Sequence, residues 1–150
     1  MSTLAAVHQT DAPAYFFGGV LMKVHLTGAQ TGGAFSMLEA VSPAGHRTPP
    51  HVHQHEDEAF FVLEGEIDII VGGKTMTVRP GESAFAPRGV PHQLQNNSGR
   101  PARGIVVATS SGFAEFVAAA GVPAHDGPPP APEPEQFMQV AERFGISLAA

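Results

Sequence analysis

The sequence has no cysteine, few basic residues and no long apolar run. Without cysteine, disulfides, zinc ribbons, iron–sulfur clusters and thiol nucleophiles are excluded, so any metal must be bound through nitrogen and oxygen. Acidic residues outnumber Lys and Arg by 14 to 8, which gives a formal net charge of −6 with no basic cluster. Nucleic acid and anionic membrane surfaces are therefore poor partners. No apolar run approaches the roughly 20 residues of a membrane helix, and the N-terminus lacks the basic start of a secretory signal. We expect a cytoplasmic protein.

The composition of the 150 residues, 43% hydrophobic and 15% charged, suits one globular domain with a proper core. Between Val20 and Val107 the chain is a series of β-branched or alternating segments that glycine and proline interrupt. Short strands are predicted for VLMKVHL, AFSMLEAV, AFFVLEGEIDIIV, KTMTV, SAFAP, HQLQN and GIVVAT. The sequences GG, RPGE and NNSG between them are typical of hairpin turns. Many short strands at even spacing indicate an all-β sandwich or barrel.

Helical spacing of apolar residues appears only near the end of the sequence. It predicts one helix over residues 113–120 and another over residues 134–144, joined by the proline-rich connector VPAHDGPPPAPEPE. A lone amphipathic helix this short is marginal in water, so we expect the last one to dock onto the rest of the protein. The expected organisation is an N-terminal arm (1–13), a β-barrel (14–112) and a helical tail with a proline-rich linker (113–150).

The segment HVHQHEDE, residues 51–58, concentrates histidines and acids in one short run. His51 and His53 lie two apart, so on a strand both imidazoles point to the same face. The polar QHED can reverse the chain, which allows Glu58 to open the next strand pointing inward. His92, after a turn, is the candidate for a third nitrogen. Such a set suits a divalent first-row metal such as iron, manganese, cobalt, nickel, copper or zinc. The alternatives are a polar strand end for the pair and a structural histidine for His92.

The strand that Glu58 opens has two faces with different expected roles. Phe60 and Val62 share the face of Glu58 and should line a cavity beside the metal. Phe61 and Leu63 point away and need cover, which the C-terminal helix or a symmetric second copy would supply, so a homodimer is expected. The full set of predicted lining residues is Met22, Met37, Phe60, Val62, Phe85 and Leu94.

Other polar residues near the histidine run are assigned no role in the site. Glu56 and Asp57 are interpreted as a solvated turn. His46 and His55 are interpreted as loop or rim residues. The site that the sequence predicts is therefore limited to three histidines and one glutamate.

Two spaced motifs carry a family resemblance. The first is a glycine, His-x-His, a glutamate and a glycine, and the second is a glycine, a proline, a glycine, a histidine and an asparagine. Together they occupy Gly45, His51, His53, Glu58, Gly65, Gly81, Pro87, Gly89, His92 and Asn96. In this pattern the chain resembles the cupin superfamily, which implies a small jelly-roll β-barrel. The resemblance also implies that His51, His53, Glu58 and His92 bind one divalent metal per chain.

A finer resemblance concerns the chemistry. TGGAFSMLEAVSPAGHRTPPHVHQHEDEAFFVLEGE and APRGVPHQLQN are similar to single-domain cupins related to quercetin 2,3-dioxygenases. This implies a metal-dependent dioxygenase for a small enolic or aromatic, flavonol-like substrate, with Glu58 as the catalytic base and dioxygen as co-substrate. The alternatives are a non-oxidative isomerase, cyclase or lyase that uses the metal as a Lewis acid, and a non-enzymatic module that binds a small ligand.

Overall fold

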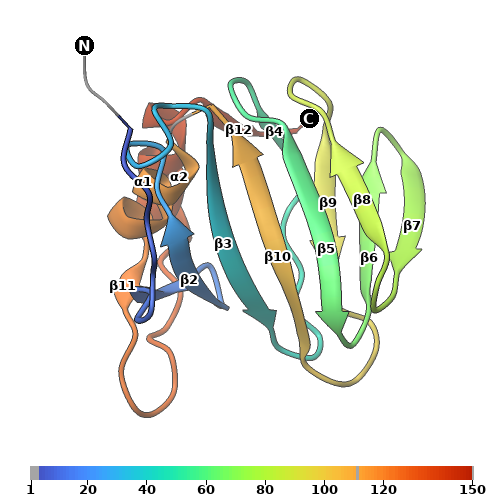
Figure 1. Cartoon of the computed structure of the whole chain (residues 1–150). Coiled ribbons are helices and arrows are strands. Elements are labelled where there is room, and N and C mark those ends of the chain that lie inside the picture. The colour runs from blue at the N-terminus through green and yellow to red at the C-terminus, as the bar shows by residue number, and fades with distance from the viewer. Residues whose placement is uncertain (1–3, 111, 150) are drawn as a thin grey trace.

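The structure, a computed structural model, describes residues 4–110 and 112–149 and contains two antiparallel β-sheets, one behind the other in Figure 1. The seven-stranded sheet has the order β11 (Val122–Pro123), β1 (Ala14–Phe17), β2 (Val20–Leu26), β3 (Phe35–Ser42), β10 (Ala102–Thr109), β5 (Glu58–Glu64), β8 (Ser83–Ala86). The five-stranded sheet has the order β12 (Ile146–Leu148), β4 (His51–His53), β9 (His92–Gln95), β6 (Ile67–Val71), β7 (Lys74–Val78). This is the predicted jelly-roll fold.

Inward-facing residues of both sheets make a single core. Leu38 and Val106 contribute from the seven-stranded sheet, and Ile69 and Val78 contribute from the five-stranded sheet. In β5 the buried and exposed positions alternate, as the sequence predicts for a strand with one face on the core. The interior between the sheets is therefore apolar except where specific polar residues enter it.

The long apolar run that ends in GEIDIIV folds as two strands, β5 and β6, in different sheets. The chain turns at Gly65, which has a φ of +74°. A Cβ atom at this position would lie 2.7 Å from the carbonyl oxygen of Pro101. Glycine is required here by both the backbone conformation and the close approach of a neighbouring segment. The turn carries the chain from the sheet of Glu58 to the sheet of the histidines.

The two predicted helices are present as α1 (Phe113–Ala120) and α2 (Pro134–Arg143), packed beside the seven-stranded sheet near β1 and β2 (Figure 1). The α2 helix docks through aromatic contacts, as expected. The ring centroids of Phe116 and Phe137 lie 5.5 Å apart, and those of Phe17 and Phe137 lie 5.1 Å apart. No helix in the described part of the chain is long and apolar enough to cross a membrane.

The sequence did not predict the last strand. After Gly145 the chain forms β12, which pairs antiparallel with β4. In this pairing Ile146 lies opposite His53 and Leu148 lies opposite His51. The strand that carries two of the candidate ligands thus has β9 on one side and the C-terminal segment on the other.

Candidate metal centre

Two adjacent strands of the five-stranded sheet bring the three predicted histidines together. His51 of β4 pairs directly with His92 of β9, and His53 follows two residues along β4. One ring nitrogen from each histidine lies within 4.8 Å of those of the other two. His53 and His92 are each only 3% exposed. The cluster therefore presents converging nitrogen atoms at the inner face of its sheet.

The fourth predicted residue enters from the opposite sheet. Glu58 is the first residue of β5, and its carboxylate lies between two of the histidines. Its Oε2 is 3.0 Å from Nε2 of His92, and its Oε1 is 3.7 Å from Nε2 of His53. The chain reversal predicted for QHED thus brings the carboxylate back to the histidines. Three imidazoles and a carboxylate make a donor set that fits a divalent first-row metal.

The electrostatics of His51, His53 and Glu58 agree with that fit. Burial, reinforced by neighbouring His92, lowers the pKa of His51 to about 4, so this imidazole is neutral at pH 7 with a lone pair to donate. Burial alone would raise the pKa of Glu58, but the adjacent histidines, chiefly His53, hold it below its usual value. Burial would also lower the pKa of His53, but Glu58 and Glu56 outweigh it and raise the value. A neutral donor beside an ionised carboxylate suits a cation.

The interior next to this cluster is apolar. Phe60 and Val62 are buried on the face of β5 that carries Glu58. The ring centroid of Phe60 lies 6.3 Å from that of His92. Leu94 pairs with the buried Ile69 and packs against the core. These side chains make the interior beside the histidine cluster largely hydrocarbon.

Met37 and Phe85 do not line the interior, so this part of the prediction is wrong. Met37 pairs with Val107, Val107 pairs with Ala59, and Ala59 pairs with Phe85. Directly paired residues share a face of the sheet, and Ala59 is on the exposed one. Phe85 is accordingly 56% exposed. The prediction chose these residues because they are apolar, and apolarity alone does not determine which face a side chain occupies.

Glu56 is not part of a solvated turn, which corrects a second interpretation. It is 3% exposed, and its Oε2 lies 3.3 Å from Nδ1 of His53. Asp57 does lie nearer the surface, where it accepts hydrogen bonds from the backbone and side chain of Arg88. Those contacts lower the pKa of Asp57 to about 2. No periodic pattern in the sequence marks Glu56, because its burial depends on segments that are distant along the chain.

Ser36 is a second interior polar residue that sequence reasoning missed. It lies on β3 opposite Ala108, which in turn lies opposite Glu58, so all three share the inner face. Ser36 is fully buried, and its hydroxyl has no hydrogen-bond partner in the described part of the chain. Its only signal in the sequence is a polar residue at an inward-facing strand position. The hydroxyl therefore has unused hydrogen-bonding capacity inside the protein.

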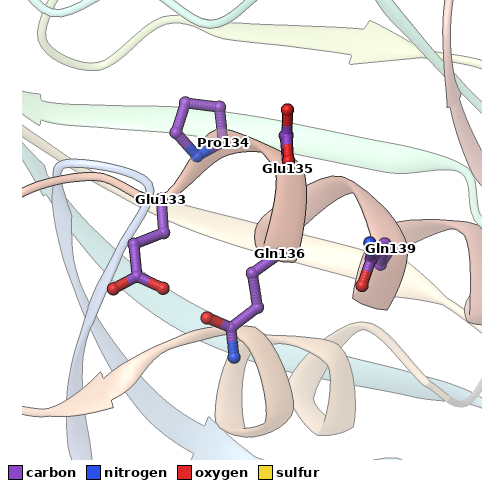
Figure 2. A pocket seen from close by; sticks show the side chains of 5 residues that line it. All are labelled: Glu133, Pro134, Glu135, Gln136 and Gln139. Atoms are coloured by element: carbon purple, nitrogen blue, oxygen red, sulfur yellow. The ribbon is translucent and has the colours of Figure 1, made fainter.

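The surface hollow in Figure 2 is remote from this centre. It lies at the start of α2 and contains none of the four candidate ligands. Its lining residues are Glu133, Pro134, Glu135, Gln136 and Gln139. Nothing in this polar lining matches the chemistry of the histidine cluster, so the candidate site is placed at the cluster.

Comparison with known proteins agrees with the fold. Residues 37–108 match the family described as Cupin domain, a stretch that contains all four candidate ligands. The polyketide cyclase RemF from Streptomyces resistomycificus is similar in structure, with a TM-score of 0.59 and 30% sequence identity over 71% of this chain and 80% of that one. The chain belongs to the cupin family.

Two curated relatives share parts of their sequence with this chain. Quercetin 2,3-dioxygenase from Bacillus subtilis is 30% identical over 86 residues, which are 57% of this chain and 26% of the relative. The tetracenomycin polyketide synthase protein TcmJ from Streptomyces glaucescens is 28% identical over 93 residues, 61% of this chain and 62% of the relative. The chain therefore spans only part of the curated relatives that it matches.

Proposed function

We propose that this cupin is a metal-dependent enzyme for a small enolic or phenolic substrate, with one divalent metal held by His51, His53, His92 and Glu58. Iron, manganese, nickel, cobalt, copper and zinc all suit this donor set. The bound metal would act as a Lewis acid that polarises an oxygen atom of the substrate. The proposal rests on the convergence of the three ring nitrogens on the Glu58 carboxylate.

The position of Glu58 supports a second role for it as a general base. It is the carboxylate nearest to the converging nitrogens, and its pKa lies below its usual value, so it is ionised and able to accept a proton. The hydrocarbon of Phe60 and Val62 excludes water around it and strengthens its electrostatic interactions. A substrate hydroxyl beside Glu58 would lose its proton to this carboxylate and become an electron-rich anion.

The lining of the interior supports an uncharged, largely apolar substrate. No lysine or arginine is among the buried polar residues of the described ranges, so a phosphate or polyanion would find no counter-charge there. Flavonols and aromatic polyketides carry enol or phenol oxygens on an apolar ring system, which matches this environment. The hydroxyl of Ser36 offers one hydrogen bond to a second oxygen of such a molecule.

Reaction of the substrate anion with dioxygen is the first candidate outcome, by analogy with the quercetin 2,3-dioxygenase relative. The second candidate is a non-oxidative cyclisation, in which the carbanion form of the same anion attacks a carbonyl carbon of the substrate. A specific observation favours this candidate: the match to the polyketide cyclase RemF covers 80% of that chain, whereas the match to the dioxygenase covers 26% of that protein. Both outcomes require deprotonation by Glu58.

The test is a set of reactions with metal-reconstituted protein under air and under argon. Quercetin, other flavonols and a linear aromatic poly-β-ketone serve as substrates, and oxygen uptake is recorded together with product masses. Oxygen uptake supports the dioxygenase if the product is heavier than the substrate by two oxygen atoms. A product whose mass equals the substrate plus two oxygen atoms minus one carbon monoxide supports it equally. A dehydrated, cyclised product under argon supports the cyclase. Tight binding without turnover would instead identify a ligand-binding module, and neither binding nor turnover with any metal would overturn the proposed substrate class.

A further inference from the structure

The three clustered histidines differ in the hydrogen-bond partner of Nδ1, the outer nitrogen of each ring. Nδ1 of His51 lies 2.8 Å from the carbonyl oxygen of Pro49. Nδ1 of His53 lies 3.3 Å from the carboxylate of Glu56. Nδ1 of His92 is buried and has no partner in the described part of the chain. His53 is therefore the cluster histidine whose outer nitrogen meets an acidic side chain.

Glu56 is an unusual residue for a loop because its carboxylate is buried. A buried carboxylate is unfavourable unless hydrogen bonds compensate for the lost water. The hydrogen-bond partner that the structure gives Glu56 is His53. The burial of this side chain is therefore tied to the ring of one candidate metal ligand.

The loop that carries Glu56 is fastened from several directions, so the position of the carboxylate is well defined. The backbone N–H of Gln54 donates to the carbonyl oxygen of Gly145. The hydroxyl of Ser110 donates to the carbonyl oxygen of His55. Asp57 exchanges backbone and side-chain hydrogen bonds with Thr109. Two segments distant along the chain, one at Thr109 and Ser110 and one at Gly145, thus hold the residues on either side of Glu56.

We propose that Glu56 is a positioning residue that fixes the tautomer and orientation of His53. Its carboxylate accepts the hydrogen bond of the Nδ1–H group, which leaves the lone pair of Nε2 directed at the space beside Glu58. A carboxylate behind a histidine ligand also makes that ligand a stronger donor to a metal. This inference rests on the proposed metal site for its purpose, although the tautomer itself is a property of the metal-free protein.

The first experiment measures that tautomer without metal. Long-range ¹⁵N–¹H NMR of the metal-free protein at pH 8 reports which ring nitrogen of His53 carries the proton, with the signals assigned by their loss in His53→Gln. We expect the proton on Nδ1 in wild type and a mixture of tautomers in Glu56→Ala. A wild-type His53 protonated on Nε2 would overturn the proposal, whether or not the protein binds metal.

The second experiment measures affinity for Zn²⁺ and Co²⁺ by competition with a chelator. Glu56→Ala is expected to bind each metal about 10- to 100-fold more weakly than wild type, the usual effect of removing a carboxylate behind a histidine ligand. Glu56→Gln keeps the shape and an acceptor oxygen, so it should recover part of that loss. Asp57→Asn is the matched control, since its carboxylate contacts Arg88 and not a histidine.

The outcomes separate this proposal from the proposed function. If wild type binds no metal but His53 shows the expected tautomer and loses it in Glu56→Ala, the metal site is wrong and the positioning role stands. If wild type binds metal and Glu56→Ala binds it equally well, the positioning role is wrong and the metal site stands. Thermal unfolding of the metal-free variants identifies a general loss of structure, and Glu56→Gln then serves as the deciding variant.

Discussion

The two faces of strand β5 have similar side chains and opposite environments. Phe60 faces inward and is 7% exposed, whereas its neighbour Phe61 faces outward and is 42% exposed. Glu58 and Glu64, at the two ends of the same strand, also differ: one is buried between histidines, and the other is on the surface beside Arg103. The comparison shows that residue type alone assigns no role here. Strand parity decides which phenylalanine faces the interior, whereas position along the strand decides between the glutamates, because Glu64 lies at the exposed end of β5.

Loss of the inner-face histidines should have the largest effect. The double variant His51→Ala/His92→Ala removes two of the four candidate ligands, so we expect it to lose nearly all of the approximately one metal ion per chain expected in wild type. Elemental analysis of protein purified without a histidine tag measures this. Equal metal content in the two proteins would contradict the site.

Substitution of the inner-face glutamate, Glu58, should have the second largest effect. Glu58→Gln keeps the size and an oxygen donor but removes the basicity, so we expect it to retain much of its metal while turnover falls by roughly a hundredfold or more. Turnover and metal content are measured on the same preparation. Glu64→Gln, at the exposed end of β5, is the control and should leave both unchanged. Normal turnover in a metal-loaded Glu58→Gln would exclude the base role.

The two phenylalanines provide the same comparison for stability. Phe60→Ala leaves a cavity in the core and should lower the free energy of unfolding by about 3 to 5 kcal/mol. Phe61→Ala removes a side chain that is partly in water and should lower it by only about 0.5 kcal/mol. Urea unfolding of both metal-free variants at low protein concentration measures the difference. Similar losses in the two variants would mean that Phe61 is covered in solution.

The exposed aromatic residues of the outer face lead to the last prediction. Phe61 and Phe85 flank half-buried apolar residues of the same face, and α2, which packs against α1, leaves them uncovered. We expect a second copy of the chain to cover this face in a symmetric homodimer. Light scattering at micromolar concentration should give a dimer for wild type and a monomer for Phe61→Glu/Phe85→Glu. A monomeric wild type would contradict this expectation and leave the face exposed.

The sequence predicted those parts of the site that depend on local spacing. His51 and His53 share a face because they lie two apart on a strand, and the two motifs together predicted Glu58 and His92, which the structure brings next to them. The errors concern features set by pairing across the sheet. Met37 and Phe85 were assigned to the interior because register cannot be derived from their apolar character.

Glu56 and β12 could not be predicted for a related reason. Glu56 is buried because segments around Ser110 and Gly145 close over its loop, and neither is near it in the sequence. The last strand is only three residues long, too short to show a period of two. Both features exist only once distant parts of the chain have come together.

The pairing of β12 with β4 has a consequence for how the protein is made. Synthesis proceeds from the N-terminus, so β4 with His51 and His53 emerges from the ribosome long before the residues that become its outer neighbour. Until Leu148 has emerged, one edge of the histidine-bearing strand is unpaired and able to hydrogen-bond to another extended chain. A nascent chain that stalls before this point therefore carries two of the candidate ligands, His51 and His53, on a strand with one open edge.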